Sequence, residues 1–205
     1  MNDTQLTLRE VLGPLTDFFT KLLSKDGPQW LVAFKRFLRK ENPWAEKASV
    51  LLLETIGTIK VGAIDRFFGG GAFTARSTEV KFAWIAQSFK QRFHKKLEEP
   101  QREVELRVSR LKKRSLDESI REELGDKAET TLATIWVLLR RQPNGGKEGM
   151  LLANGFANIF YVRDADRDFT AVRIVWSADG WRLHAFLVGS LTDGWDEDGR
   201  VFSRA

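Results

Sequence analysis

Apolar residues recur at helical spacing in two short segments near the N-terminus. The first segment carries one apolar stripe, formed by Leu15, Phe18, Phe19, Leu22 and Leu23. This pattern predicts an amphipathic helix. Thr7 and Glu10 have the spacing of a capping box at a helix start, but Gly13-Pro14 interrupts, so we expect the stable helix to begin at Pro14, where a missing N–H costs nothing. A second stripe lies within 28–40, after the turn Asp26-Gly27-Pro28. Two such helices joined by a short turn predict a helical hairpin.

The pattern is ambiguous from 44 to 75. Apolar and β-branched residues are dense over 49–64, which fits either a strand or a buried helix. Gly69-Gly70-Gly71 is a flexible break in the chain. We therefore place a mainly helical N-terminal region at 1–75 and an α+β domain at 76–205.

Apolar and polar residues alternate, as is typical of strands, after Thr78. This alternation predicts strands over 80–84, 104–108, 159–162, 169–176 and 181–187, with a short one at 201–202. Helical spacing predicts helices over 88–97, 115–125 and 131–141. A capping box of Ser115 and Glu118 is expected to start the second of these helices, and Thr131 is expected to cap the third.

Together these elements predict the α+β class, with an N-terminal helical hairpin followed by a mixed domain. The connections between the C-terminal strands are too short for parallel crossovers, so we expect an antiparallel β-meander packed on the helix 131–141. Trp176 and Trp181 flank a hairpin turn and are expected to pair across the strands. The predicted core comprises Trp84, Val104, Leu106, Leu132, Trp136, Ile159, Val172, Ile174, Trp176, Trp181 and Leu183.

Composition narrows the chemistry. The chain has 205 residues and no cysteine, which excludes disulfides, thiol nucleophiles and cysteine-ligated metals. The sequence shows no secretory signal and no apolar run near the roughly 18–20 residues of a membrane span. We expect a cytoplasmic protein with no membrane contact.

The formal charge of +5 is unevenly distributed. Residues 1–100 carry 16 basic and 11 acidic residues, whereas 101–205 carry 17 of each. The basic residues that we single out as a candidate nucleic-acid site are Lys90, Arg92, Lys95, Lys96, Arg107, Arg110, Lys112, Lys113 and Arg114. Phe89 and Phe93 interleave with them, and such a cluster predicts salt-sensitive, sequence-independent binding. The alternative is a solvated face whose cations pair with Glu98, Glu99, Glu103 and Glu105.

One segment, 154–161, matches the RNA-recognition-motif consensus at six of eight positions. Asn154 replaces the basic residue of that consensus, and Asn158 replaces a stacking aromatic residue. Hairpins follow the segment where that fold requires a helix, so we interpret it as a half-buried structural strand. From Met150 onward the charge is −2, which argues against phosphate binding in this block.

Other candidate sites lack essential parts. Asp164–Asp168 has the first acidic positions of a calcium loop, but Phe169 replaces its glycine and Val175 its bidentate glutamate. Acidic residues recur at Asp193, Asp196, Glu197 and Asp198, where we favour a solvated loop. His94 and His184 are too few for a histidine-rich metal site, and no hydrolase or phosphate-loop motif is present. We therefore predict no metal, no cofactor and no catalytic residue, and lean against an enzyme.

Four blocks of sequence resemble a known group of proteins: 24–44, 88–100, 115–125 and 154–204. The last reads NGFANIFYVRD, then VRIVW, DGWRLHAF and VFSR. It resembles the C-terminal block NGYANIFYVRD…GW…VFSR of uncharacterised bacterial proteins from environmental genomes, with Phe156 in place of Tyr. The group has no established activity, so the resemblance implies a shared bacterial domain and no catalytic residue.

Three functions remain open from the sequence. The first is a non-catalytic binding or interaction protein of unknown partner. The second is a nucleic-acid binder that uses the basic segment 90–114. The third is an enzyme without a recognisable motif.

Overall fold

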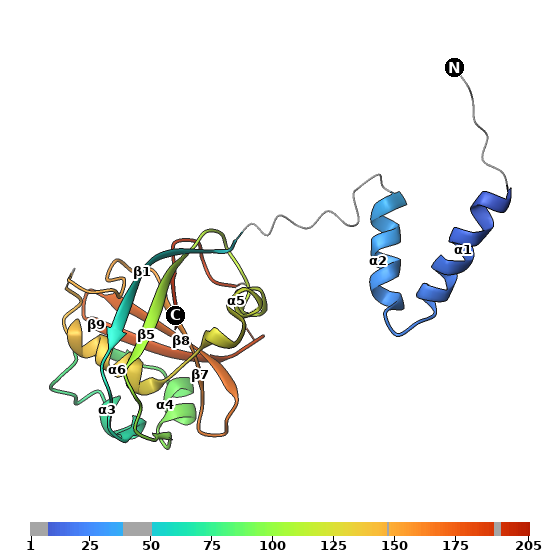
Figure 1. The fold of residues 1–205 in the computed structure, drawn as a ribbon. Coiled ribbons are helices and arrows are strands. Elements are labelled where there is room, and N and C mark those ends of the chain that lie inside the picture. The colour runs from blue at the N-terminus through green and yellow to red at the C-terminus, as the bar shows by residue number, and fades with distance from the viewer. Residues whose placement is uncertain (1–7, 39–50, 147, 191–193) are drawn as a thin grey trace. The chain divides into compact units, whose positions relative to one another are not determined.

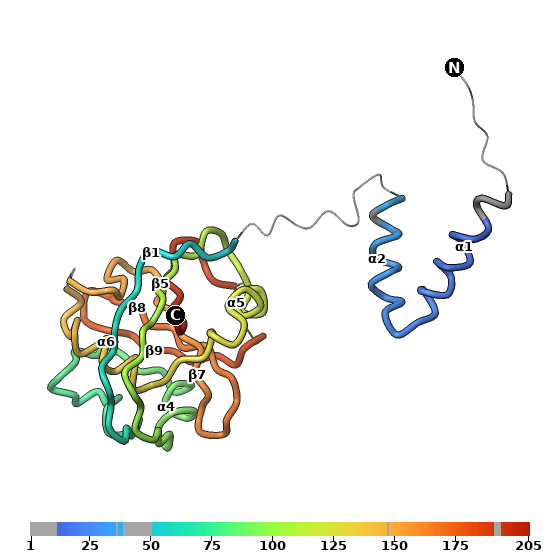
Figure 2. Tube along the Cα trace, viewed as in Figure 1, coloured from blue at the N-terminus to red at the C-terminus, as the bar shows by residue number. Residues whose placement is uncertain are grey.

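The computed structural model describes residues 8–38, 51–146, 148–190 and 194–205 (Figures 1 and 2). The chain divides into two compact units, 1–50 and 51–205. The segment Gly69–Gly71 lies inside the second unit, where it forms most of the short helix α3 (Gly69–Ala72). Each unit is described by itself below.

The first unit contains helices α1 (Leu8–Leu22) and α2 (Gly27–Leu38). The prediction that the first helix begins at Pro14 is wrong, because the helix starts earlier and continues through the proline. A proline inside a helix costs one backbone hydrogen bond, and here it does not end the helix. The two helices touch where the Phe18 and Phe34 ring centroids lie 4.5 Å apart. Lys21 Nζ also lies 4.5 Å from the centroid of the Trp30 ring.

The second unit is built on one mixed sheet, which confirms the α+β class. Its strands run in the order β1 (Leu53–Val61), β5 (Val104–Leu111), β10 (Arg200–Arg204), β7 (Asn158–Arg163), β8 (Phe169–Ser177), β9 (Gly180–Leu187) and β3 (Phe82–Ile85). A short strand, β6 (Glu129–Thr130), pairs with β7 at Tyr161 and Val162. Strands β2 (Phe67–Phe68) and β4 (Leu97–Glu98) form a separate pair.

Strand β7 has different kinds of neighbour on its two edges. Consecutive strands β7, β8 and β9 pair antiparallel. Trp176 lies opposite Trp181 in this pairing, and their rings meet edge to face at 5.1 Å, as predicted. Strand β10 lies on the other edge of β7 and runs parallel to it. This parallel pairing needs no long crossover, because β8 and β9 lie between the two strands in the sequence.

The two faces of the sheet are covered by different helices. Helices α3, α4 (Gln87–Phe93) and α6 (Leu132–Arg141) enclose the larger core, which includes Phe89, Trp136 and Trp181. Helix α5 (Asp117–Leu124) and the 3₁₀ turn η1 (Gly125–Ala128) cover part of the other face, around Tyr161 and Trp195. Residues of β7 therefore alternate between two buried cores.

Some predictions about individual residues are confirmed and others are wrong. Thr131 caps α6, since its hydroxyl accepts a hydrogen bond from the Thr134 N–H. The capping box at Ser115 is wrong, because the residue before α5 is Leu116 and no side chain caps it. The ambiguous stretch contains strand β1. Trp84, assigned to the core, is 49% exposed, because it lies on the open face of an edge strand.

Candidate binding face on the sheet

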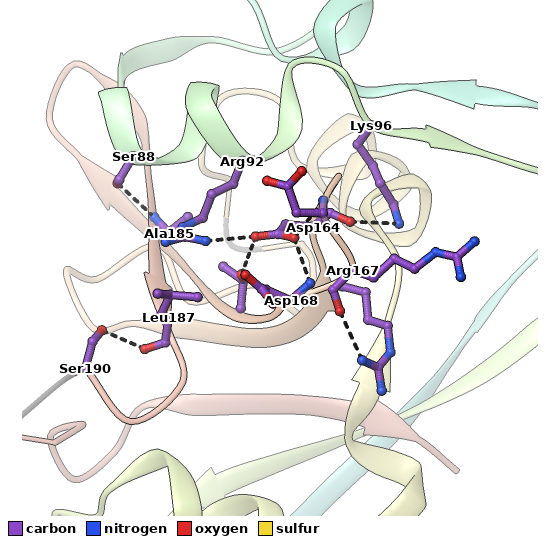
Figure 3. Close-up of polar contacts among 12 residues, drawn as sticks. Ser88, Arg92, Lys96, Asp164, Arg167, Asp168, Ala185, Leu187 and Ser190 are labelled. Carbon is purple, nitrogen blue, oxygen red and sulfur yellow. Dashed lines mark hydrogen bonds and ion pairs between the residues drawn. The ribbon is translucent and has the colours of Figure 1, made fainter.

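Two members of the basic segment 90–114 contact the buried Asp164, which begins an exposed turn. Arg92 Nη1 lies 2.8 Å from Asp164 Oδ2, and Lys96 Nζ donates to the Asp164 carbonyl oxygen at 3.4 Å (Figure 3). Asp164 is 1% exposed. Its carboxylate also accepts hydrogen bonds from the Thr170 hydroxyl and from the backbone N–H groups of Asp166 and Asp168. The carboxylate is thus committed to protein donors, which leaves the 164–168 turn a structural element.

The remaining basic residues fall into separated groups. Arg110 pairs with Glu54 at 2.7 Å and lies 3.8 Å from Asp198. Arg114 Nε lies 3.9 Å from Asp196 Oδ1. Four lysines remain: Lys90 lies in α4 and Lys95 just after it, whereas Lys112 and Lys113 follow the end of β5.

Strand β5 separates these groups. Its eight residues span roughly 25 Å at about 3.3 Å each. Arg107 lies within it, half-buried. The glutamates that we expected to pair with these cations have other partners. Glu98 caps α6 by accepting hydrogen bonds from the N–H groups of Leu132 and Ala133, and Glu99 pairs with Arg66. The basic segment therefore does not form one continuous patch.

A different cluster gathers on the sheet, where the alternation of β9 directs its side chains to opposite faces. Trp181, Leu183 and Ala185 enter the larger core. Arg182 and His184 lie on the other face, as the sequence pattern predicts. Register then adds residues from the neighbouring strands. Arg173 of β8 lies opposite His184, and Trp84 of β3 lies beside Arg182.

Aromatic rings form a continuous row across this face. Trp84 and His184 meet edge to face, with ring centroids 4.7 Å apart. His184 and Phe186 are parallel within 7° at 6.0 Å. Phe186 then meets Trp195 at 6.2 Å. The row runs from the half-exposed Trp84 to the buried Trp195. We call Trp84, Arg173, Arg182, His184 and Phe186 the aromatic face.

The row ends beside a cavity of about 400 Å³. Its wall is formed by Asn154, Gly155, Phe156, Ala157, Arg173, Phe186, Gly194, Trp195 and Asp196. Gly194 has φ +73°, and a Cβ there would lie 2.7 Å from the Ser115 carbonyl oxygen. This close approach lets Ser115 and Trp195 exchange backbone hydrogen bonds of 3.1 and 2.8 Å. Glycine at 194 thus fixes one side of the cavity.

A buried carboxylate positions Trp195. Asp117 Oδ1 accepts hydrogen bonds from Trp195 Nε1 at 2.6 Å and from the Tyr161 hydroxyl at 2.9 Å. Asp117 is 1% exposed, and its Oδ2 has no hydrogen-bond partner among the described residues. Burial first, and then the charge of Asp117, raise the pKa of Tyr161 far above its ordinary value. Tyr161 therefore remains a neutral donor at any physiological pH.

The aromatic face is electropositive. Arg182 Nε donates to the Ser177 hydroxyl at 3.1 Å. Among the described residues, neither Arg173 nor Arg182 has a carboxylate within ion-pair distance. Burial, followed by the charges of Arg173 and Arg182, lowers the pKa of His184 below 6.5. The histidine is consequently neutral near pH 7, and the two arginines carry the charge.

This arrangement suits binding of a planar, anionic ligand. Exposed rings offer stacking surfaces, and guanidinium groups offer paired hydrogen bonds to phosphate or carboxylate. Within the described ranges, no group of three or more His, Asp or Glu side chains could hold a metal ion. None of the described helices is long and apolar enough to cross a membrane.

Sequence reasoning missed Arg173 and Phe186 as site residues and misplaced Trp84. The available signal was the period-2 alternation of β8 and β9, which places Arg173, Arg182 and His184 on polar faces. The acidic residues that we assigned to a solvated loop were a weaker signal. Asp193 lies outside the described residues, and Asp196 lines the cavity beside Arg173. No protein-family model, curated protein or solved structure matches this chain, so its resemblance to the environmental bacterial group stays a prediction.

Proposed function

We propose that this is a non-catalytic binding protein whose ligand site is the aromatic face. The observation that carries the proposal is a pair of arginines, Arg173 and Arg182, that flank a row of rings and have no carboxylate partner among the described residues. Charged side chains on a protein surface are ordinarily dispersed or paired. A half-exposed tryptophan beside an arginine that has no carboxylate partner among the described residues is costly to leave uncovered unless it serves recognition.

The ligand class that fits this chemistry best is single-stranded nucleic acid. Unpaired bases stack on aromatic rings in a sequence-tolerant way, and each phosphate neutralised by arginine releases counterions. The face joins both requirements on adjacent strands. A double helix presents its bases edge-on within grooves, so it would leave the ring surface of Trp84 unused.

The structure also explains why the motif-like segment 154–161 is a poor candidate for this role. Two of its three aromatic residues, Phe160 and Tyr161, are buried in the two cores and cannot stack on a ligand, whereas Phe156 is exposed in the wall of the cavity. The net charge of −2 from Met150 onward is likewise a poor guide to where an anion could bind in this block. Asp164 of that block is neutralised locally by Arg92, whereas Arg173 and Arg182 converge on the open face.

The basic segment 90–114 supplies a second candidate surface for the same ligand class. Lys112 and Lys113 are exposed beyond β5. They lie beside the acidic residues Asp196 and Asp198, which contact Arg114 and Arg110. That neighbourhood weakens the local positive potential, so we favour the aromatic face.

Fluorescence anisotropy of a labelled single-stranded oligonucleotide, measured at two salt concentrations, tests the proposal. We expect salt-sensitive binding that Arg182→Glu weakens about 10-fold or more, since hydrogen bonds to charged groups contribute roughly 1.5–3 kcal/mol. The charge-matched control Lys113→Glu should change affinity much less. Loss of binding in Lys113→Glu but not in Arg182→Glu would move the site to the basic segment, and absence of binding at low salt would overturn the proposal.

A further inference from the structure

The helical hairpin α1–α2 has almost no core of its own. Apart from Gly27 at the turn, none of its described side chains is fully buried. Eight large apolar residues are exposed instead: Leu12, Leu15, Phe19, Leu23, Leu31, Val32, Phe37 and Leu38. Leu23 is 89% exposed. Two helices of 15 and 12 residues are marginal in water without such packing, so this surface requires a cover.

The apolar residues of each helix, including the half-buried Leu22 and Phe34, follow the spacing of a helix-bundle seam. In α1, the positions Leu12, Leu15, Phe19 and Leu22 are separated by three, four and three residues. In α2, Leu31, Phe34 and Leu38 continue the same three-and-four rule. Phe18 and Phe34 already join the two helices of one hairpin. A seam on each helix that extends beyond this contact is the pattern of a bundle with more than two helices.

The size of the surface matches an ordinary interface. The eight exposed fractions add up to between four and five complete residues, or about 700–900 Å² at roughly 150–200 Å² each. A stable protein–protein interface buries roughly 800 Å² per partner. The eight residues, of which Leu23, Val32 and Phe37 lie beside the seams, together expose about the apolar area that one half of a symmetric dimer needs.

The charge of the hairpin distinguishes between the partners that could cover its apolar surface. The segment 8–38 carries five basic and three acidic residues, a net of +2, and the acidic residues all lie in α1 and the turn. Asp17 and Lys21 pair within α1 at 3.4 Å. Lys25 and Asp26 are adjacent at the turn. A mixed surface of this kind neither repels a second copy strongly nor forms the one-sided basic face that anionic membranes attract.

We propose that two copies of this chain associate through their α1–α2 hairpins to form a four-helix bundle. The seams on α1 and α2 of one copy pack against those of the other, which is the isologous contact of a two-fold dimer. The association does not depend on the ligand proposed for the aromatic face. It would, however, bring two aromatic faces into one assembly and raise the apparent affinity for a long strand.

Sedimentation velocity of the full chain over a range of concentrations tests the association. We expect a monomer–dimer equilibrium for the native sequence. The double variant Phe19→Glu, Leu31→Glu places charges on both seams and should weaken dimerisation about 100-fold or more, since burying unpaired charge costs several kcal/mol. The control Thr20→Glu, Gln29→Glu adds the same charge at exposed polar positions of the same helices and should leave the dimer intact.

A further measurement keeps the outcome interpretable. The backbone amide nuclear magnetic resonance signals of 51–205 should be unchanged in the double variant, which shows that the loss is confined to the hairpin. A native chain that remains monomeric at every concentration would overturn the proposal. So would a dimer that survives the double variant, or a monomer that binds anionic vesicles through these residues.

Discussion

Trp84 packs edge-on against His184, with ring centroids 4.7 Å apart, while half of its surface remains exposed. The two residues lie about 100 positions apart in the chain and meet because β3 pairs with β9 at the sheet edge. The indole is thus oriented on one side by the imidazole and is open on the other. An oriented, half-exposed ring loses little side-chain entropy when a ligand stacks on it.

Removing this ring should weaken nucleic-acid binding without unfolding the protein. We expect Trp84→Ala to lower affinity about 5- to 150-fold, which corresponds to about 1–3 kcal/mol of stacking on one base. Trp84→Phe keeps a stacking surface and should retain most of the affinity. Anisotropy titration measures the first effect, and thermal unfolding should show only a small change because half of the side chain is exposed. Equal affinity for the alanine variant and the native protein would exclude Trp84 from the site.

Binding should also depend on pH through His184. Burial and the two neighbouring arginines lower its pKa below 6.5. A bound anion offsets the arginine charges and raises that pKa, so ligand binding is coupled to proton uptake. Affinity is therefore expected to increase as the pH falls from 7 into the range of the His184 pKa. His184→Asn should flatten the profile, whereas the control His94→Asn should preserve it.

In the free protein, His184 makes folding stability decrease as the pH falls, which is opposite to its expected effect on affinity. Because the folded pKa of His184 is below 6.5, the unfolded chain binds the proton more readily between these two values. The contribution of His184 to folding stability is complete above pH 6.5 and is lost as the pH falls toward the folded pKa. Urea unfolding at several pH values measures this dependence. A His184→Asn variant whose acid dependence equals that of the native protein would contradict it.

Asp117 should be important for stability and for the cavity wall. Asp117→Ala leaves the buried Tyr161 hydroxyl and Trp195 Nε1 without their shared acceptor, so we expect a loss of about 3 kcal/mol in the free energy of unfolding. Urea denaturation measures that loss. The matched control is Glu118→Ala, at an exposed neighbouring position of α5, which should cost little. Equal effects at the two positions would contradict this role for Asp117.

Asp164 provides a matching test in the turn between β7 and β8. Asp164→Ala removes the partner of Arg92 and the acceptor for Thr170 and two backbone N–H groups, and should destabilise the fold by about 3–5 kcal/mol. The side chain of Asp166 is exposed, so Asp166→Ala should be nearly neutral. Chemical denaturation of both variants gives the comparison. A neutral Asp164→Ala variant would show that the turn does not need the carboxylate.

Features set by neighbours along the chain could be predicted from the sequence. The Thr131 cap and the Trp176–Trp181 pair depend on residues within a few positions of each other. The outward direction of Arg182 follows from the alternation of β9 alone. These are local consequences of capping and of the two-residue period of a strand.

Features set by distant pairing could not. Whether Trp84 is buried depends on the place of β3 at the sheet edge, on its irregular register with β9, and on which face α5 covers. The partners of Arg92 and Arg110, which are Asp164 and Glu54, come from segments more than 50 residues away. The sequence shows which charged residues are present. Only the order of the strands in the sheet shows which of them are neutralised by an ion pair.

The most direct test of the aromatic face is a nuclear magnetic resonance titration that follows the tryptophan indole N–H signals during addition of a single-stranded oligonucleotide. We predict that the Trp84 signal and the backbone amides around Arg173, Arg182 and His184 shift progressively and saturate together. The buried Trp181 indole, which donates to the Gln142 carbonyl oxygen, should remain in place. Shifts confined to Lys112 and Lys113, with Trp84 unmoved, would contradict it.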